Sequence, residues 1–111
     1  MNILIVGAGI GGLGLAALLK QRGIGCEIVE RAPNLQHAGY MLALYPMGNR
    51  VLHGLGKFEE FVERSSPFNT YEVHNGHGDL LHKFDVSKIS EEFGYTGQIL
   101  RKDLLDILRK A

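Results

Sequence analysis

The sequence predicts an α/β fold, because a strand, a glycine-rich turn, a helix and a second strand follow one another within its first thirty residues. Asn2–Val6 is a short β-branched run that leads directly into the turn Gly7–Gly12. Gly12–Arg22 is rich in Leu and Ala and predicts a helix, and Cys26–Glu30 predicts the second strand. This order and length are typical of a β–α–β unit. Strands in such units usually lie parallel, with both faces covered, so we expect the two strands to be fully buried.

A loop, an extended segment and two short helices are predicted next. The loop is Arg31–Gly39, which contains proline and asparagine, and the extended segment is Tyr40–Leu44. Pro46 stands where the first turn of a helix tolerates it. Met47–Leu55 and Lys57–Arg64 predict two helices that glycines separate.

The last part of the chain predicts a β-hairpin and a C-terminal helix. Thr70–His74 alternates in polarity, Asn75–Gly78 is typical of a turn, and Asp79–Val86 continues as an extended segment. Ser87–Thr96 is polar, and we expect it to be irregular. Leu100–Leu108 has apolar residues at helical spacing and predicts the closing helix.

Composition limits the function classes. The 111 residues include 12 Lys and Arg and 12 Asp and Glu, so the formal net charge is zero and a nucleic-acid partner is disfavoured. No apolar stretch approaches the roughly 18 to 20 residues that a membrane-spanning helix needs. Cys26 is the only cysteine, which excludes an internal disulfide and a cysteine-based zinc site and fits a reducing, cytoplasmic location.

The turn Gly7-x-Gly9-x-x-Gly12 is a dinucleotide-binding fingerprint. Gly7 lets the chain leave the strand in a tight turn, Gly9 lets the backbone approach a pyrophosphate, and Gly12 lets the helix pack closely on the strand. The N-terminus of the helix then presents free N–H groups to the phosphates. The turn follows a strand and opens a helix, and this context strengthens the match.

Glu30 closes the second strand, where an acidic residue accepts hydrogen bonds from a ribose diol. The same carboxylate would repel a 2′-phosphate, which disfavours NADP at this site. The alternative is a glycine-rich turn without a ligand and a surface glutamate. The fingerprint and Glu30 together favour an incomplete Rossmann-like fold that binds FAD or NAD(P).

The whole chain resembles the N-terminal FAD-binding part of the aromatic-ring flavoprotein monooxygenases, the para-hydroxybenzoate hydroxylase type. Gly7–Gly12 followed by Glu30-Arg31-Ala32 is similar to the start of that family. Ala38–Leu44 resembles the family's segment near the flavin, and Pro46–Gly56 resembles the following helix with its terminal Leu-Gly pair. Leu100-Arg-x-x-Leu-x-x-x-Leu108 matches the family's later helix.

The resemblance implies a set of cofactor-binding residues and no assigned catalytic residue. It implies that the glycine turn holds the FAD pyrophosphate, that Glu30 binds the adenosine ribose, and that Arg31 lies near the adenine end. Arg101 would reach the phosphates or the ribityl chain, which suits the multi-donor guanidinium. The full set is Gly7, Ala8, Gly9, Ile10, Gly11, Gly12, Glu30, Arg31 and Arg101.

The function that the resemblance implies belongs to a longer enzyme. Family members use FAD, NAD(P)H and O₂ to hydroxylate a small, usually aromatic, substrate. Residues 1–111 would be an N-terminal fragment of the FAD-binding domain without a substrate domain, inactive alone and prone to self-association through an open strand edge. Two alternatives stay open: a non-catalytic fragment that binds a nucleotide or a partner, and an NAD-dependent dehydrogenase domain.

A metal site is not predicted. His74, His77 and His82 lie in or beside the hairpin, but no cysteine or carboxylate cluster completes a ligand set, and Asp79 alone does not suffice. We interpret the three histidines as solvated. Cys26 is interpreted as a small core residue.

Overall fold

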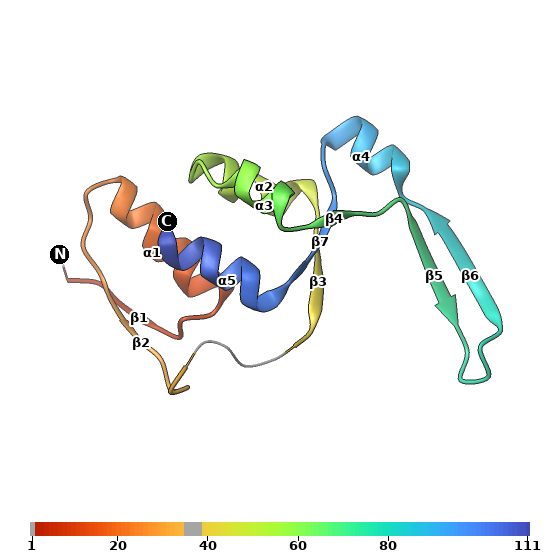
Figure 1. Ribbon diagram of the computed structural model, residues 1–111. Helices are drawn as coiled ribbons and strands as arrows, with labels where there is room; N and C mark the ends of the chain where they lie inside the picture. Colours follow the sequence, from red (N-terminus) through yellow and green to blue (C-terminus); the bar gives the residue numbers. More distant parts are fainter. Residues whose placement is uncertain (1, 35–38) are drawn as a thin grey trace.

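The predicted strand–helix–strand unit is present at the N-terminus. A computed structural model describes residues 2–34 and 39–111 (Figure 1). Strand β1 (Leu4–Val6), helix α1 (Ile10–Gln21) and strand β2 (Glu27–Val29) follow one another. The two strands are parallel, and their central residues, Ile5 and Ile28, lie opposite each other. The chain therefore passes from β1 to α1 through the glycine turn.

The expectation that these two strands are fully buried was wrong. Ile5 is their only buried residue, whereas Val6 is 82% exposed and all of β2 is exposed. Helix α1 packs on one face of the pair, and none of the described residues covers the other face to the same extent. Cys26 is half-buried and is not part of the apolar core, so its interpretation as a core residue was also wrong.

Two predicted segments reach beyond the described residues. The loop Arg31–Gly39 includes residues 35–38, and the family-like segment Ala38–Leu44 begins inside that gap. From Gly39 onward the chain is described again, and strand β3 (Met41–Leu44) confirms the extended segment.

The two predicted middle helices are α2 (Pro46–Gly54) and α3 (Phe58–Glu63). Pro46 occupies the first turn of α2, where its missing N–H breaks no helical hydrogen bond. Gly56 has a φ of +66°, a backbone angle that favours glycine, and it lies in the turn between the helices.

A three-stranded antiparallel sheet occupies the middle of the molecule. Strand β7 (Gly97–Leu100) lies between β3 and β4 (Ser66–Pro67). In the β3–β7 pair Met41 lies opposite Leu100, and Leu44 lies opposite Gly97. Strands β4 and β7 have no local signal in the sequence and were not predicted, because both are short and pair only with segments distant in the sequence.

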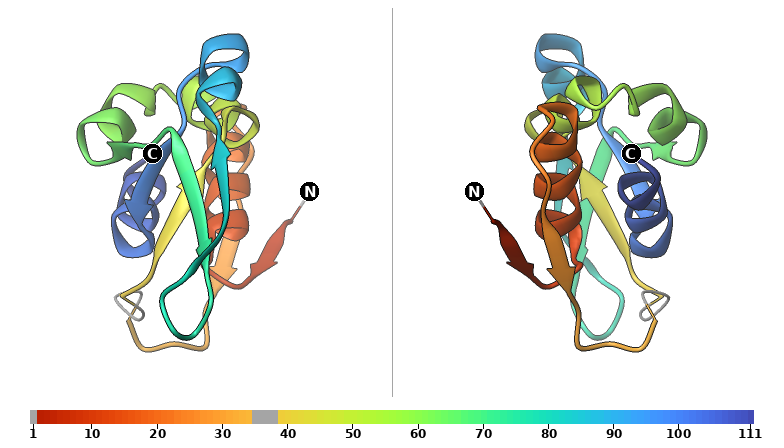
Figure 2. Two further views of the ribbon diagram at one scale, coloured as in Figure 1. Left: turned by 90° about the vertical axis from the view of Figure 1, so that its right-hand side faces the viewer. Right: turned by 90° about the vertical axis from the view of Figure 1, so that its left-hand side faces the viewer.

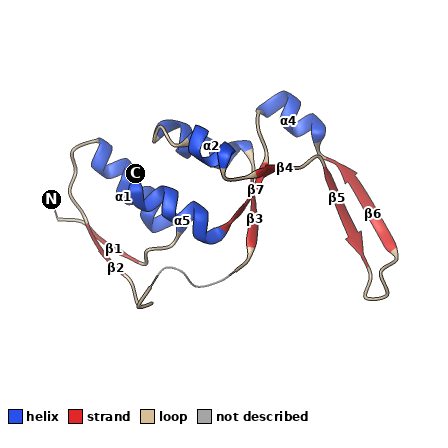
Figure 3. Ribbon diagram, viewed as in Figure 1, coloured by secondary structure: helices blue, strands red, loops and turns tan. Residues whose placement is uncertain are grey.

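The predicted hairpin is confirmed as β5 (Thr70–His74) and β6 (Leu80–Asp85), and it projects away from the helices (Figure 3). Its turn is held by Asn75, whose Oδ1 accepts the backbone N–H groups of residues 77 and 79, each at 2.9 Å. The following segment corrects the sequence analysis: Ser87–Phe93 is helix α4, not irregular. Asp85 Oδ1 accepts the N–H of Ser87 at 2.9 Å, which satisfies one free donor where the helix begins.

Helix α5 (Arg101–Lys110) closes the core, as the apolar spacing predicted. It packs against α1 and α3, and it runs in the same direction as α1, so the N-termini of both helices lie at the same end of the helix pair (Figures 1 and 2). Within the described ranges, no helix has the length and hydrophobicity that a membrane span requires. The buried core comprises Ala8, Leu13, Ala17, Leu52, Leu55, Phe61, Ile99, Leu104, Leu105, Ile107 and Leu108.

An ion-pair network fixes α5 to α3. Arg64 donates to Asp103 at 2.6 Å and to Asp106 at 3.0 Å, and a third contact to Glu60 measures 3.5 Å. The Lys110 ammonium and then the Arg64 guanidinium hold the pKa of Asp106 far below its usual value. The planar guanidinium thus bridges two carboxylates one helical turn apart on α5.

We expect the hairpin to lose stability as the pH rises through the pKa of His74. Nε2 of His74 faces Glu72 Oε2 at 3.1 Å, and Nδ1 faces the Gly78 carbonyl oxygen, also at 3.1 Å. These two acceptors favour the doubly protonated ring and raise the pKa of His74 above its ordinary 6.5. The stabilisation is therefore full below pH 6.5 and is lost above the raised pKa. A ¹H NMR titration of His74 measures this pKa.

The matched variant is Glu72→Gln. Because it removes the carboxylate that contributes most, the pKa of His74 should fall back toward 6.5. An identical titration curve in the variant would contradict the assignment.

Candidate functional site

The glycine turn leaves β1 through a conformation that favours glycine. Gly7 has a φ of +104°, in the region that side chains with a Cβ rarely adopt. Its N–H donates to the Val29 carbonyl oxygen at 2.7 Å, which extends the β1–β2 ladder by one bond. The turn therefore starts at a fixed point beside the end of β2.

Gly12 and Gly9 are glycines for different physical reasons. A Cβ on Gly12 would overlap the Gly7 carbonyl oxygen and would lie 3.2 Å from the Cγ2 of Ile5. Gly12 is thus required by the packing of α1 on β1. A Cβ on Gly9 would meet no atom within 4 Å, and its φ of −77° suits any residue. The described chain itself does not require a glycine at position 9, so the open space there is available to a ligand.

The N-terminus of α1 offers an anion site beside this space. Gly9 caps the helix, and its carbonyl accepts the first helical bond, from Leu13 at 2.9 Å. No side chain caps the helix, and its first turn contains no acidic residue. The N–H groups of residues 10–12 have no acceptor within the helix, and together with the helix dipole they favour a phosphate.

Glu30 connects the end of β2 to the glycine turn. Its Oε2 accepts the N–H of Ala8 at 2.7 Å, and its Oε1 accepts the N–H of Ala32 at 2.8 Å. The Ala32 bond, followed by the Ala8 bond, lowers the pKa of Glu30 from its ordinary 4.5. The carboxylate is therefore charged at neutral pH and holds the turn through its backbone.

The two bonds leave Glu30 able to bind a ribose. An ionised carboxylate has about four acceptor positions, and the two backbone N–H groups occupy two of them. Acceptor capacity therefore remains for the hydroxyls of a diol. Glu30 is exposed and borders a cavity of about 550 Å³ at the carboxyl ends of β1 and β2. The residues that line this cavity are Val6, Gly7, Val29, Glu30 and Arg31.

Arg101 lies apart from that cavity lining. It is the first residue of α5, whose N-terminus lies at the same end of the helix pair as the N-terminus of α1 (Figure 2). Its N–H donates to the Tyr40 carbonyl at 3.0 Å, and its Cζ lies 5.7 Å from the centre of the Tyr40 ring. This cation–π contact helps orient the guanidinium.

The structure thus brings together most of the residues that the sequence singled out, and it adds two that the sequence did not. Gly7, Glu30 and Arg31 share one cavity. Tyr40 and the backbone N–H of Ala32 were missed. The contact of Tyr40 depends on the pairing of β3 with β7, and no local signal in the sequence indicates that pairing.

Comparison with known proteins points to one family. The family described as "FAD binding domain" matches residues 1–110. A 3-amino-4-hydroxybenzoate 2-monooxygenase from Streptomyces cremeus is 54% identical over 56 residues, which is 50% of this chain. An FAD-dependent urate hydroxylase from Mycolicibacterium vanbaalenii is 33% identical over 113 residues and spans all of this chain. The chain covers only 14% and 29% of these two relatives.

A solved structure confirms the fold. The p-nitrophenol 4-monooxygenase from Pseudomonas putida DLL-E4 matches 98% of this chain with a TM-score of 0.81, at 18% identity. This chain covers 29% of that structure. At such identity the match supports the Rossmann-like arrangement and not a shared substrate.

Alanine at the two glycines should separate binding from folding. Gly9→Ala should leave stability nearly unchanged and weaken FAD binding by roughly tenfold or more, because its methyl group enters the space next to the free N–H groups. Gly12→Ala should lower the free energy of unfolding by about 1–3 kcal/mol, because its Cβ overlaps a backbone carbonyl. Urea denaturation and an FAD titration followed by NMR measure the two effects.

Gly14→Ala is the control within the same helix. A Cβ there meets no atom within 4 Å, so the helix should gain stability, by about 0.5–1 kcal/mol, without a change in FAD affinity. Equal effects of Gly9→Ala and Gly12→Ala on stability would refute the separate roles.

Glu30→Gln should weaken FAD binding by roughly tenfold or more, because a neutral amide replaces the charged carboxylate. The NH₂ group of the amide would then face either a backbone N–H, which cannot accept it, or the ribose. The lowered pKa of Glu30 also predicts how FAD binding depends on pH. Binding should be full above pH 4.5, decline as the pH falls through the lower pKa of Glu30, and lose this decline in the variant. Glu27→Gln, at the other end of β2, is the matched control. Unchanged FAD affinity in Glu30→Gln would rule out the ribose role.

Proposed function

Because the chain belongs to the FAD-binding domain family of the flavin-dependent aromatic-ring monooxygenases, we propose that residues 1–111 form the N-terminal part of such a domain in a longer enzyme. The complete enzyme hydroxylates a small aromatic substrate with NAD(P)H and O₂. The share of its relatives that the chain covers, 14% and 29%, supports the assignment to a part of the enzyme.

One observation supports this function above the others. The glycine turn, the free N-terminus of α1 and the charged Glu30 carboxylate meet at the carboxyl ends of β1 and β2. Ligands of open parallel sheets bind at this edge. The open space that a Cβ on Gly9 would occupy leaves room for a pyrophosphate, which supports the proposal.

We assign the adenosine and pyrophosphate end of FAD to this chain. The N–H groups of the Gly7–Gly12 turn hold the pyrophosphate, Glu30 binds the ribose, and Arg31 lies at the adenine end. Arg101, oriented by Tyr40, is assigned to the phosphates or the ribityl chain. When bound, the flavin supplies the redox and oxygen chemistry, and the protein binds, orients and shields it.

The substrate pocket belongs, in this proposal, to other parts of the enzyme. Hydroxylation requires a flavin that is shielded from water and held against the substrate. The isolated chain is expected to self-associate through the open strand edge of the β1–β2 pair, where Leu4 is 59% and Val6 82% exposed. The single Cys26 supports a cytoplasmic location.

The alternative function is a fragment that binds a nucleotide or a partner without turnover. The site geometry suits both, because the same N–H groups and carboxylate bind any adenosine pyrophosphate. The visible spectrum of the purified protein distinguishes them, since bound flavin absorbs near 450 nm (roughly, as in any flavoprotein). The third interpretation, an NAD-dependent dehydrogenase domain, is disfavoured by the family assignment.

We expect the isolated 111-residue chain to bind FAD weakly and to consume no NAD(P)H in response to a substrate. The assay combines the chain with FAD, NADH or NADPH and a panel of phenolic acids, with size-exclusion chromatography to report self-association. Stoichiometric hydroxylated product from a monomeric preparation would overturn the fragment assignment. Saturating ADP binding without flavin binding would favour the non-catalytic alternative.

A further inference from the structure

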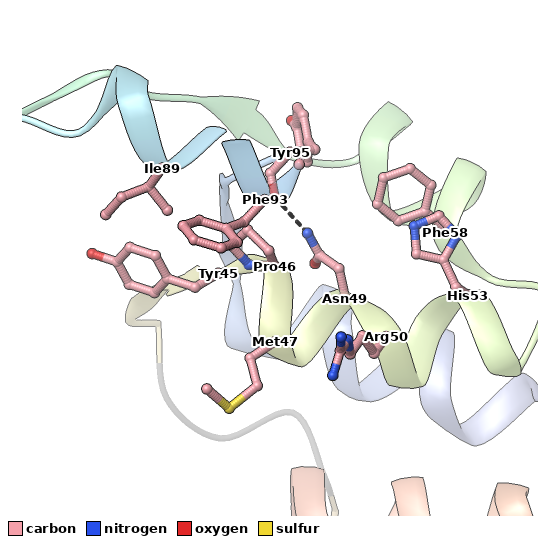
Figure 4. A pocket seen from close by; sticks show the side chains of 11 residues that line it. Tyr45, Pro46, Met47, Asn49, Arg50, His53, Phe58, Ile89, Phe93 and Tyr95 are labelled. Carbon is pink, nitrogen blue, oxygen red and sulfur yellow. Dashed lines mark hydrogen bonds between the residues drawn. The ribbon is translucent and has the colours of Figure 1, made fainter. Parts of the chain in front are cut away.

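A second cavity lies at the opposite end of the antiparallel sheet from Arg101. The register pairs Met41 with Leu100 at the Arg101 end and Leu44 with Gly97 at the other. The second cavity, of about 510 Å³, opens beyond Leu44 and Gly97, between α2 and α4 (Figure 4). Cavities that hold small organic ligands commonly measure about 300–1,000 Å³.

The cavity contains a buried polar atom without a partner. Asn49, on α2, lines the cavity and is only 3% exposed. Its Nδ2 donates to the Tyr95 carbonyl oxygen at 2.5 Å, which fixes the orientation of the amide (Figure 4). Its Oδ1 is buried and accepts no hydrogen bond from the described residues. A buried acceptor in this state costs free energy that a donor from a ligand would recover.

Aromatic rings stand on both sides of Asn49. Tyr45 and Phe93 lie on one side, and both are exposed to solvent, at 41% and 66% (Figure 4). His53 and Phe58 lie on the other side, and their rings stack with centroids 3.8 Å apart. Rings so placed favour a planar aromatic molecule, which covers their exposed faces. The guanidinium of Arg50, at the same cavity, disfavours a cationic ligand.

We propose that this cavity is a second binding site, for a small, neutral or anionic, planar aromatic molecule that donates one hydrogen bond to Asn49 Oδ1. The site is separate from the glycine turn and from Arg101, and the proposal does not depend on FAD binding. The volume of the cavity and the single acceptor suit a free small molecule with one N–H or O–H group.

The test compares indole with 1-methylindole on the unchanged chain. The two probes have the same planar ring, and only indole has an N–H donor. A ¹H–¹⁵N NMR titration should show saturable shifts at the Asn49 side-chain amide and at Gly94, with indole binding at least about fivefold more tightly. If water satisfied Oδ1 equally well, the two probes would bind alike.

Two variants test whether Asn49 Oδ1 causes the preference for indole over 1-methylindole. Asn49→Leu should bring the two probes to equal affinity, because it removes the acceptor. Thr96→Val is the matched control. Oγ1 of Thr96 is also buried and has no hydrogen-bond partner among the described residues, but Thr96 does not line the cavity, so the preference for indole should persist. Equal affinities on the unchanged chain, shifts centred elsewhere, or no saturable binding would each overturn the proposal.

Discussion

The close approach of α1 to β1 at Gly12 is the constraint on which the rest of the structure depends. It places the helix N-terminus directly beside the end of the strand, with the Gly7 carbonyl where a side chain would otherwise be. Leu13 and Ala17 then face inward against α5. The same contact therefore positions both the apolar core and the free N–H groups of the candidate site. A looser approach would separate those N–H groups from Glu30, which is fixed beside the turn by its bond from the N–H of Ala8.

Arg101, the residue proposed to bind the cofactor from a second element, is positioned from the other side. It begins α5 where β7 ends, and the pairing of β7 with β3 brings it to Tyr40. The ion pairs of Arg64 with Asp103 and Asp106 fix the angle of α5 against α3. The position of the Arg101 guanidinium thus depends on two independent features, the register of β3 with β7 and the ion pairs of Arg64. The molecule measures 53 × 32 × 22 Å, and the glycine turn and Arg101 both lie at the N-terminal end of the paired helices α1 and α5 (Figure 1).

The sequence predicted those helices and strands whose formation depends on residues within the element itself. The β1–α1–β2 unit, helices α2, α3 and α5, and the hairpin each contain their own periodicity or turn residues. Strand β7 and helix α4 were missed. The four residues of β7 form a strand only because β3 and β4 pair with them, and α4 is a single polar helix of seven residues without a buried face.

In the candidate site, too, some features could be predicted from the sequence and others could not. The glycine turn and Glu30 follow from spacing, and their joint position follows from the β–α–β geometry. The bond from Ala8 to Glu30 and the contact of Tyr40 with Arg101 required coordinates. The burial of the strands was mispredicted because hydrophobic sequence indicates a preference for burial, and the described residues supply only one covering layer.

The packing of α1 against α5 has a consequence for folding during synthesis. Helix α1 leaves the ribosome early, but α5, the helix against which it packs most extensively, is made only after β2, α2 and the strands between them. The pairing of β3 with β7 likewise closes a long loop, which slows its formation relative to the local hairpin β5–β6. The nascent chain therefore exposes Leu13 and Ala17 until the residues of α5 have been made. Such exposed apolar surface is the kind that chaperones shield.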